Sequence, residues 1–363
     1  MRISMGIVTI CAFLGFVPAR GGEMKELSFY NVKPVGRELT VDGNLDEAEW
    51  KTACSHTRYY EYFKPDPEIG KLETEYRMLY SKKGIYLAIL NHEKNMDKLK
   101  AEFTARDSEN LWKDDCDEIY IDAFGEGVGY TKFTINSIGT VGDMKRIDNS
   151  VVLNEWSGSG WTCAVVRNGD SWVVEAFFPW DDLGNTAKEG AVWRFCNTRY
   201  AWTFGNFVGV SSSPGGSYQN TAGFGYLYFS GEKPLSPDNI GSILSERVAP
   251  SWMLSEGNNL IICEKKAKFK VEPVAGYVVK EKEKVLKLTD DTRRILEKLK
   301  DAEGKVKIAK TLDETVSALD KANPEKASVS ENMLLLKKLS KCWISINESY
   351  WLAKTVELLD NKI

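Results

Sequence analysis

The spacing of apolar residues changes once along this chain. From about residue 30 to about residue 230, apolar and polar positions alternate over short runs, which is the pattern of strands with one buried face. After Pro237, apolar residues recur at intervals of three and four, which is the pattern of amphipathic helices. The sequence therefore predicts a β domain followed by an α-helical domain.

The β region is predicted to consist of short strands joined by turns. Residues 73–91 alternate as a hairpin, and residues 160–166 and 171–178 form another around Asn168-Gly169, a dipeptide that favours a tight turn. Further strands are expected at residues 117–124, 129–138, 192–200 and 223–229. Because no long helix intervenes, we predict a mainly β fold, an antiparallel, immunoglobulin-like and jelly-roll-like β-sandwich, over residues 30–235.

Three amphipathic helices are predicted in the C-terminal part. They cover residues 281–300, residues 306–321 and a stretch that begins at Ser328. The last of these opens with Ser328-Val-Ser-Glu331, a capping box. Three such helices need a shared core, so an α-helical hairpin or bundle is predicted over residues 281–363, with residues 236–280 as a connector. The third helix carries an apolar stripe, which we interpret as core, with a face for a protein partner as the alternative: Leu336, Leu339, Trp343, Ile346 and Tyr350.

The first residues are interpreted as a signal peptide. Arg2 gives the start a positive charge, residues 5–17 form a run without charge, and Val17-Pro-Ala19 resembles a cleavage site. The run is too short to span a bilayer. We therefore expect residues 1–19 to direct export, which gives a periplasmic or secreted protein without a membrane span; an uncleaved anchor is the alternative.

Composition narrows the class of ligand. The chain has 11 Trp, 15 Tyr and 15 Phe, side chains that offer large flat surfaces. Its formal net charge of −4 excludes nucleic acid as the expected partner, since neutralising phosphates requires a basic surface. The cysteines are widely spaced without a CxxC pair, so structural thiols are predicted rather than zinc ligands.

The stretch from Trp112 to Phe124 combines acidic and aromatic residues in a strand pattern. One side of the strand is predicted to face the core, with Ile119, Ile121 and Ala123. The other side carries Glu118, Tyr120, Asp122 and Phe124. Carboxylates interleaved with aromatic rings suit a ligand that is polar yet partly apolar, such as a sugar. For Glu118, an ion pair with Lys or Arg of a neighbouring strand is the alternative.

The region from Leu39 to Phe229 resembles the family 9 carbohydrate-binding modules and their relatives in the DOMON-like β-sandwich superfamily. The resemblance rests on VDGNLDEAEW (41–50), WKDDCDEIYID (112–122), KFTIN (132–136), WVVEAFFPWDDLG (172–184), GAVWRF followed by Arg199 (190–199) and FGYLYF (224–229). It implies non-catalytic binding of carbohydrate, with the terminal sugar of a glycan or oligosaccharide held between two aromatic rings. The helical domain shows no such resemblance.

The resemblance also implies which residues bind the sugar. The candidate ligand-binding residues are Trp112 and Tyr218 as the two rings, Glu118 and Asn136 as partners of hydroxyl groups, and Arg199, which follows the GAVWRF stretch. Several positions depart from the family pattern. Thr134 stands where a basic residue is expected, and Cys196 stands where an asparagine is frequent. Gly215 and Gly216 stand where amides are expected, and Tyr218 stands where the family has a tryptophan.

Three other functions are considered. A glycosidase would use two carboxylates, for which Glu118 and Glu175 are the candidates. A haem-binding sandwich would use Met78 and His92 as axial ligands. A structural or docking module would have lost sugar binding. No cofactor is predicted, except that relatives often hold a structural calcium ion, for which the candidate ligands are Asp114, Asp115 and Asp117.

Overall fold

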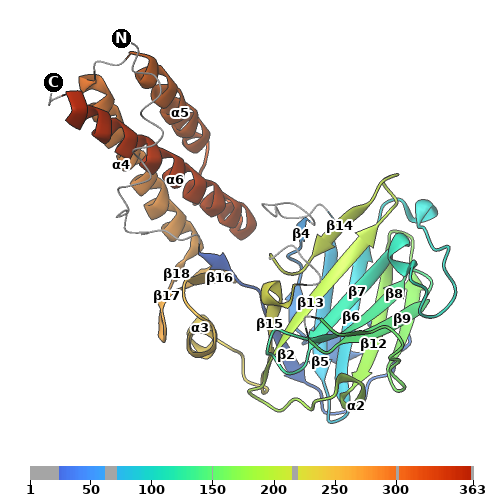
Figure 1. Cartoon of the computed structure of the whole chain (residues 1–363). Coiled ribbons are helices and arrows are strands. Elements are labelled where there is room, and N and C mark those ends of the chain that lie inside the picture. Colours follow the sequence, from blue (N-terminus) through green and yellow to red (C-terminus); the bar gives the residue numbers. More distant parts are fainter. Residues whose placement is uncertain (1–23, 62–71, 149, 215–219, 300–301, 361–363) are drawn as a thin grey trace. The chain divides into compact units, whose positions relative to one another are not determined.

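The computed structural model describes residues 24–61, 72–148, 150–214, 220–299 and 302–360. Contacts divide the chain into two compact units, drawn in Figure 1. The first covers residues 26–240, and the second covers residues 241–360 together with residues 24 and 25. The two units are described separately below.

The first unit is mainly β, as predicted. Its strands are β2 (Phe29–Pro34), β3 (Ser55–His56), β4 (Tyr60–Glu61), β5 (Thr74–Tyr80), β6 (Gly84–His92), β7 (Cys116–Asp122), β8 (Tyr130–Asn136), β9 (Val141–Arg146), β10 (Val152–Leu153), β11 (Thr162–Arg167), β12 (Ser171–Pro179), β13 (Val192–Ala201), β14 (Val208–Ser211) and β15 (Gly225–Phe229). The short helices are η1 (Ala48–Lys51), η2 (Met96–Lys98), η3 (Leu111–Lys113), α2 (Trp180–Leu183) and η4 (Thr221–Gly223). Both predicted hairpins, β5 with β6 and β11 with β12, are confirmed.

The strands form one curled sheet that folds into the two layers of a sandwich (Figure 1). Their order is β10-β9-β8-β7-β13-β15-β2-β5-β6-β12-β11. The described strand pairs are antiparallel, as predicted, except those of β2, which runs parallel to β15 on one side and to β5 on the other. This strand joins the two layers, and the sequence did not predict it.

The core lies between the two layers. One layer contributes Ile119, Ile121, Phe133, Ile135 and Phe195, and the other contributes Tyr76, Met78, Ile89, Val174 and Phe178. Full burial of a side chain of this size stabilises the fold by about 1.5–3 kcal/mol. Because successive residues of a strand point to opposite sides, burying Ile119 and Ile121 turns Glu118 and Tyr120 to the other face of the sheet. The predicted orientation of this strand is confirmed.

The second unit contains a small sheet and four helices. The sheet has the order β1-β16-β17-β18, with β1 (Lys25–Glu26), β16 (Trp252–Glu256), β17 (Asn259–Lys265) and β18 (Lys268–Pro273). The helices are α3 (Pro237–Arg247), α4 (Val274–Lys298), α5 (Ala302–Asp320) and α6 (Val329–Asp360). The three predicted C-terminal helices are present. The stretch predicted as a connector, residues 236–280, holds α3, three strands and the start of α4.

Helix α6 begins as its sequence predicts. Ser328 Oγ accepts a hydrogen bond from Glu331 N at 3.2 Å, and Glu331 Oε2 accepts one from Ser328 N at 2.7 Å, which is a capping box. Leu336, Leu339 and Ile346 of the apolar stripe are buried in the core of the unit, as predicted. No helix among the residues that the structure describes is both long and apolar enough to cross a membrane.

Candidate functional site

A hollow of about 640 Å³ lies over the face of the sheet that points away from the core. The residues that line it and matter most below are Trp112, Glu118, Tyr120, Tyr130, Lys132 and Met144. The register explains why they converge, since Glu118 pairs with Thr134 and Tyr120 with Lys132 across β7 and β8. Paired residues of antiparallel strands share a face. One face of β7, β8 and β9 therefore supplies the floor of the hollow.

A buried ion pair lies in this floor. The carboxylate of Glu118, a residue only 2% exposed, accepts a hydrogen bond from Lys132 Nζ at 2.6 Å. Its other oxygen accepts bonds from the hydroxyl of Tyr200 at 3.0 Å and from that of Tyr120. Burial acts to lower the pKa of Lys132, but the charge and hydrogen bond of Glu118 outweigh it and raise that pKa. Lys132 is therefore charged at neutral pH, and it keeps two further N–H groups as donors.

Trp112 stands at the edge of the same hollow. It lies in η3, where its neighbour Leu111 is buried and anchors the turn, while Trp112 itself is 43% exposed. A tryptophan side chain is usually more buried than this. The predicted stacking ring and the predicted carboxylate, Trp112 and Glu118, therefore line one cavity.

Asn136 lies at the end of β8 and is fully buried. Its side-chain nitrogen donates to Phe103 O and to Asp114 Oδ2, both at 3.0 Å. Its side-chain oxygen accepts from Ile138 N at 3.2 Å and from Thr140 N at 2.8 Å. These four bonds fill the hydrogen-bonding capacity of an amide. Asn136 therefore braces the turn after β8.

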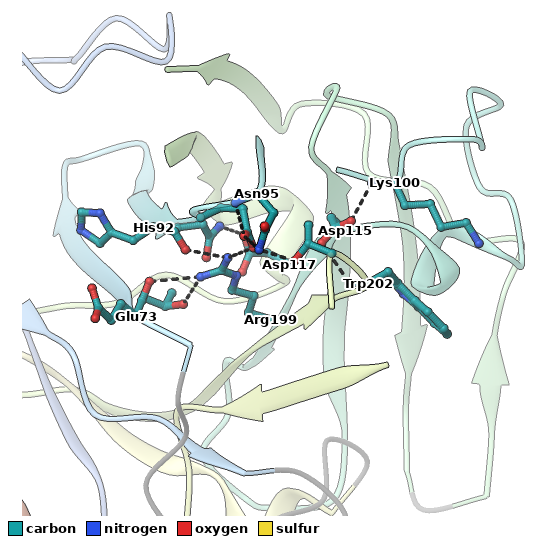
Figure 2. Close-up of polar contacts among 12 residues, drawn as sticks. Glu73, His92, Asn95, Lys100, Asp115, Asp117, Arg199 and Trp202 are labelled. Atoms are coloured by element: carbon teal, nitrogen blue, oxygen red, sulfur yellow. Dashed lines mark hydrogen bonds and ion pairs between the residues drawn. The ribbon is translucent and has the colours of Figure 1, made fainter. Parts of the chain in front are cut away.

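Arg199 lies on the opposite face of the sheet from the hollow. It pairs with Asp117 across β13 and β7, and both side chains point into the sandwich. The residue is 1% exposed. Its guanidinium donates to Glu73 O, Thr74 Oγ1, His92 O and Glu93 Oε2, at 3.1, 3.1, 2.9 and 3.4 Å. Figure 2 shows this network, which holds the ends of β5 and β6 to β13.

Comparison with known proteins places this site within a family. The model of the family described as carbohydrate family 9 binding domain-like matches residues 41–232, more than half of the 363 residues. The chain belongs to this family. The match begins at the turn before η1 and ends after β15, so the whole hollow lies inside the family 9 domain.

The chain is also similar to solved structures. A family 9 carbohydrate-binding module from Caldicellulosiruptor kristjanssonii, in complex with cellotriose, is 12% identical and covers 58% of this chain and 100% of its own, with a TM-score of 0.44. The same kind of module in complex with glucose is 11% identical, covers 58% and 99%, and has a TM-score of 0.43. A protein from Bacteroides uniformis is 16% identical, covers 56% and 100%, and has a TM-score of 0.47. No curated protein sequence matches the chain.

The basic residue in the floor of the family 9 domain was not among the predicted site residues. The family pattern expects a basic side chain at position 134, where this chain has Thr134. Lys132 precedes it by two residues on the same strand face and supplies the ammonium group instead. The alternation of residues 130–136 already places Lys132 on the same strand face as Thr134. The ion-pair alternative for Glu118 is thereby confirmed.

Tyr218, the predicted second ring of the family 9 domain, lies outside the described residues. The two-ring arrangement therefore stays a prediction. A second indole, Trp202, does lie beside Trp112, and its Nε1 donates to Trp112 O at 3.3 Å. Sequence reasoning missed it because it lies in the turn after β13, about ninety residues from Trp112.

The predicted calcium ligands do not fit a metal ion. Their carboxylates are held by N–H donors: Asp114 by Glu102 N and Phe103 N, Asp115 by Lys100 N and Trp202 N, and Asp117 by Asn91 Nδ2. Calcium binds lone pairs of oxygen, and it would displace these donors. Within the described ranges, no group of three or more His, Cys, Asp or Glu is arranged to hold a metal ion.

The candidate residues of the other two functions do not converge either. Glu175 is fully buried and accepts hydrogen bonds from Asp42 N, Gly43 N and Trp50 Nε1, at 2.9, 2.9 and 3.1 Å. It therefore anchors the turn before η1 rather than facing Glu118. Met78 is in the core opposite Leu87, and His92 lies five residues farther along β6, roughly 17 Å away at the usual rise of a strand. The two side chains are too far apart to be axial ligands of one iron.

Proposed function

We propose that the family 9 domain binds a carbohydrate, without catalysis, in the hollow over β7, β8 and β9. The observation that carries this proposal is the juxtaposition of an exposed indole, Trp112, with the Glu118–Lys132 ion pair in a cavity of about 640 Å³. A pyranose needs both kinds of group, because the apolar face of its ring packs on an aromatic surface and its hydroxyl groups need hydrogen-bond partners.

The polar part of the proposed site is preorganised. Glu118 is fixed by three donors, and Lys132 is fixed by Glu118. A sugar hydroxyl can accept from the free N–H groups of Lys132 and donate to the remaining lone pair of the carboxylate. Hydrogen bonds to charged groups contribute about 1.5–3 kcal/mol each. Because neither side chain has to be ordered on binding, little of this contribution is lost to entropy.

The other predicted site residues have different roles. Tyr218 is proposed as a second ring that covers a terminal sugar, in the loop between β14 and η4. Asn136 and Arg199 are assigned to the scaffold, because their hydrogen bonds lie within the protein. Export through residues 1–19 to the periplasm or the outside completes the proposal, since polymeric glycans are found there.

Replacing Trp112 by alanine is expected to weaken binding at least tenfold, about 1.4 kcal/mol, because the apolar face of the sugar loses its contact surface. The measurement is isothermal titration calorimetry of the full chain with a panel of soluble oligosaccharides that includes glucose and cellotriose. Trp351→Ala is the matched control, because Trp351 is similarly exposed (51%) but lies on α6 in the other unit.

Two outcomes would contradict this proposal. If the parent chain binds no glycan of the panel, the domain does not have the proposed function. If the parent binds a glycan and Trp112→Ala binds it as tightly as Trp351→Ala does, the sugar lies elsewhere on the domain. Retained circular dichroism of both variants makes either result interpretable.

A further inference from the structure

A second indole lies next to the proposed sugar site. Trp202 follows the last residue of β13, and Thr198 of that strand pairs with Glu118. Residues 198, 200 and 202 alternate to one side, so Trp202 projects to the face that carries the hollow. The ring centroids of Trp112 and Trp202 are 6.2 Å apart, and the ring planes are tilted by 46°.

The position of Trp202 is fixed by a buried carboxylate. Asp115 is 1% exposed, and its two oxygens accept hydrogen bonds from Trp202 N at 3.1 Å and from Lys100 N at 2.7 Å. Figure 2 shows this carboxylate between the two segments. The ring of Phe207, just before β14, packs against the indole of Trp202, with ring centroids 5.2 Å apart. Trp202 is therefore held in place without a ligand, as a preformed binding surface requires.

The two indoles form one bent surface rather than two facing walls. Atoms in contact are about 3.5–4 Å apart, so a sugar held between two rings needs nearly parallel planes about 7–8 Å apart. Rings 6.2 Å apart and tilted by 46° leave no such gap. They can instead support two successive sugar rings, one on each indole.

Each of the two indoles has an ammonium group over its ring. Lys113 Nζ is 5.5 Å from the ring centroid of Trp112, and Lys100 Nζ is 5.2 Å from that of Trp202. Each ammonium lies over its ring at the distance of a cation–π contact. Such groups donate hydrogen bonds to hydroxyls at the edge of a stacked sugar.

We infer that Trp202 is a second sugar-stacking residue and that the ligand is an oligosaccharide with at least two consecutive pyranoses, each with an apolar ring face. This inference rests on the proposed function. The sugar ring that stacks on Trp112 reaches the Glu118–Lys132 pair in the hollow. The next sugar ring of the oligosaccharide stacks on Trp202. Asp115 is the positioning residue for Trp202.

The test compares the affinities of oligosaccharides of different length. Cello-, xylo- and chito-oligosaccharides of one, two and three units are titrated calorimetrically into the full chain, the parent and Trp202→Ala. For a series that binds, the parent is expected to gain at least tenfold in affinity from one to two units. Trp202→Ala is expected to bind the single sugar like the parent and to lose that gain. Trp202→Phe, which keeps a ring, is expected to retain part of it.

Phe204→Ala is the matched control, because Phe204 is an exposed aromatic (52%) of the same turn. It is expected to keep the full gain. A Trp202→Ala variant that keeps the gain, or that weakens the single sugar and the longer ones by the same factor, overturns the inference while the proposed function stands. A parent that binds no member of the three series overturns both.

Discussion

Replacing Arg199 by methionine is expected to lower the free energy of unfolding of the β unit by about 3–5 kcal/mol. The guanidinium is buried and donates to carbonyl oxygens of two strands and to the carboxylate of Glu93. Burial lowers the pKa of Arg199, while Asp117 and Glu93 favour its charged form. Methionine fills a similar volume but removes these hydrogen bonds and leaves the buried carboxylate of Glu93 without its cation. Denaturant unfolding followed by tryptophan fluorescence at neutral pH measures the difference.

Arg37→Met is the control for this prediction. Arg37 also pairs with a carboxylate, that of Glu49 at 2.7 Å, but its side chain is 54% exposed. Exposed pairs of this kind contribute little to stability, because water and salt screen the two charges. If Arg199→Met destabilises the domain no more than Arg37→Met does, the buried network does not hold the layers together. A large difference places Arg199 in the scaffold.

The role of Arg199 shows which part of the site the sequence could predict. Its place in a stretch that resembles the family suggested a ligand contact. Strand alternation gives the side of each residue within one strand, but it does not give the register between β13 and β7. Only the pairing of Arg199 with Asp117, and of Thr198 with Glu118, shows that the arginine faces inward. A charged side chain inside a sandwich is also contrary to the usual hydrophobic pattern.

The fold was predictable where local sequence decides it. Asn168-Gly169 lies in a turn between strands that pair with each other, so the β11–β12 hairpin needs no distant information. Strand β2 pairs in parallel with β15, about 200 residues away, and nothing in its own sequence marks that partner. Helix α4 begins at Val274 rather than at residue 281, because Val274 and Val278 are buried in the core of the unit. That burial outweighs the low helix propensity of valine and Gly276.

The hollow was predictable in part for the same reason. Glu118 followed from the alternation in β7, and Lys132 could have followed from that in β8. The Trp112–Trp202 pair could not, because it forms where the segment before β7 meets the turn after β13. Its second ring is positioned by Asp115, a residue whose acidic neighbours suggested a metal site instead. Hydrogen bonds from backbone N–H groups distinguish a positioning role of Asp115 from a metal site. These bonds depend on the fold.

A second large effect is expected from pH. Asp117 is fully buried, and burial raises its pKa to about 7 even though Asn91, Asn197 and Arg199 favour the charged form. In the unfolded chain the pKa is about 3.9. The folded domain therefore binds this proton more tightly than the unfolded chain does. The resulting stability is fully present below about pH 4 and is lost as the pH rises to about 7.

Asp117→Asn removes this titration. Between pH 5 and pH 8, the free energy of unfolding of the variant is expected to rise relative to that of the parent by on the order of 2 kcal/mol, because the amide cannot ionise. Denaturant titrations at pH 5, 6, 7 and 8 measure the free energy of unfolding of the variant and of the parent. Any destabilisation by the substitution that does not vary with pH leaves the expected rise unchanged.

Asp148→Asn is the matched control. Asp148 is exposed, and the hydroxyl and backbone of Ser150 lower its pKa, so it is ionised in both states over this range. The difference in free energy of unfolding between Asp148→Asn and the parent is therefore expected to stay constant with pH. Parallel stability curves for Asp117→Asn and the parent from pH 5 to pH 8 would show that Asp117 is already ionised in the folded domain, with Arg199 holding the charge inside the sandwich.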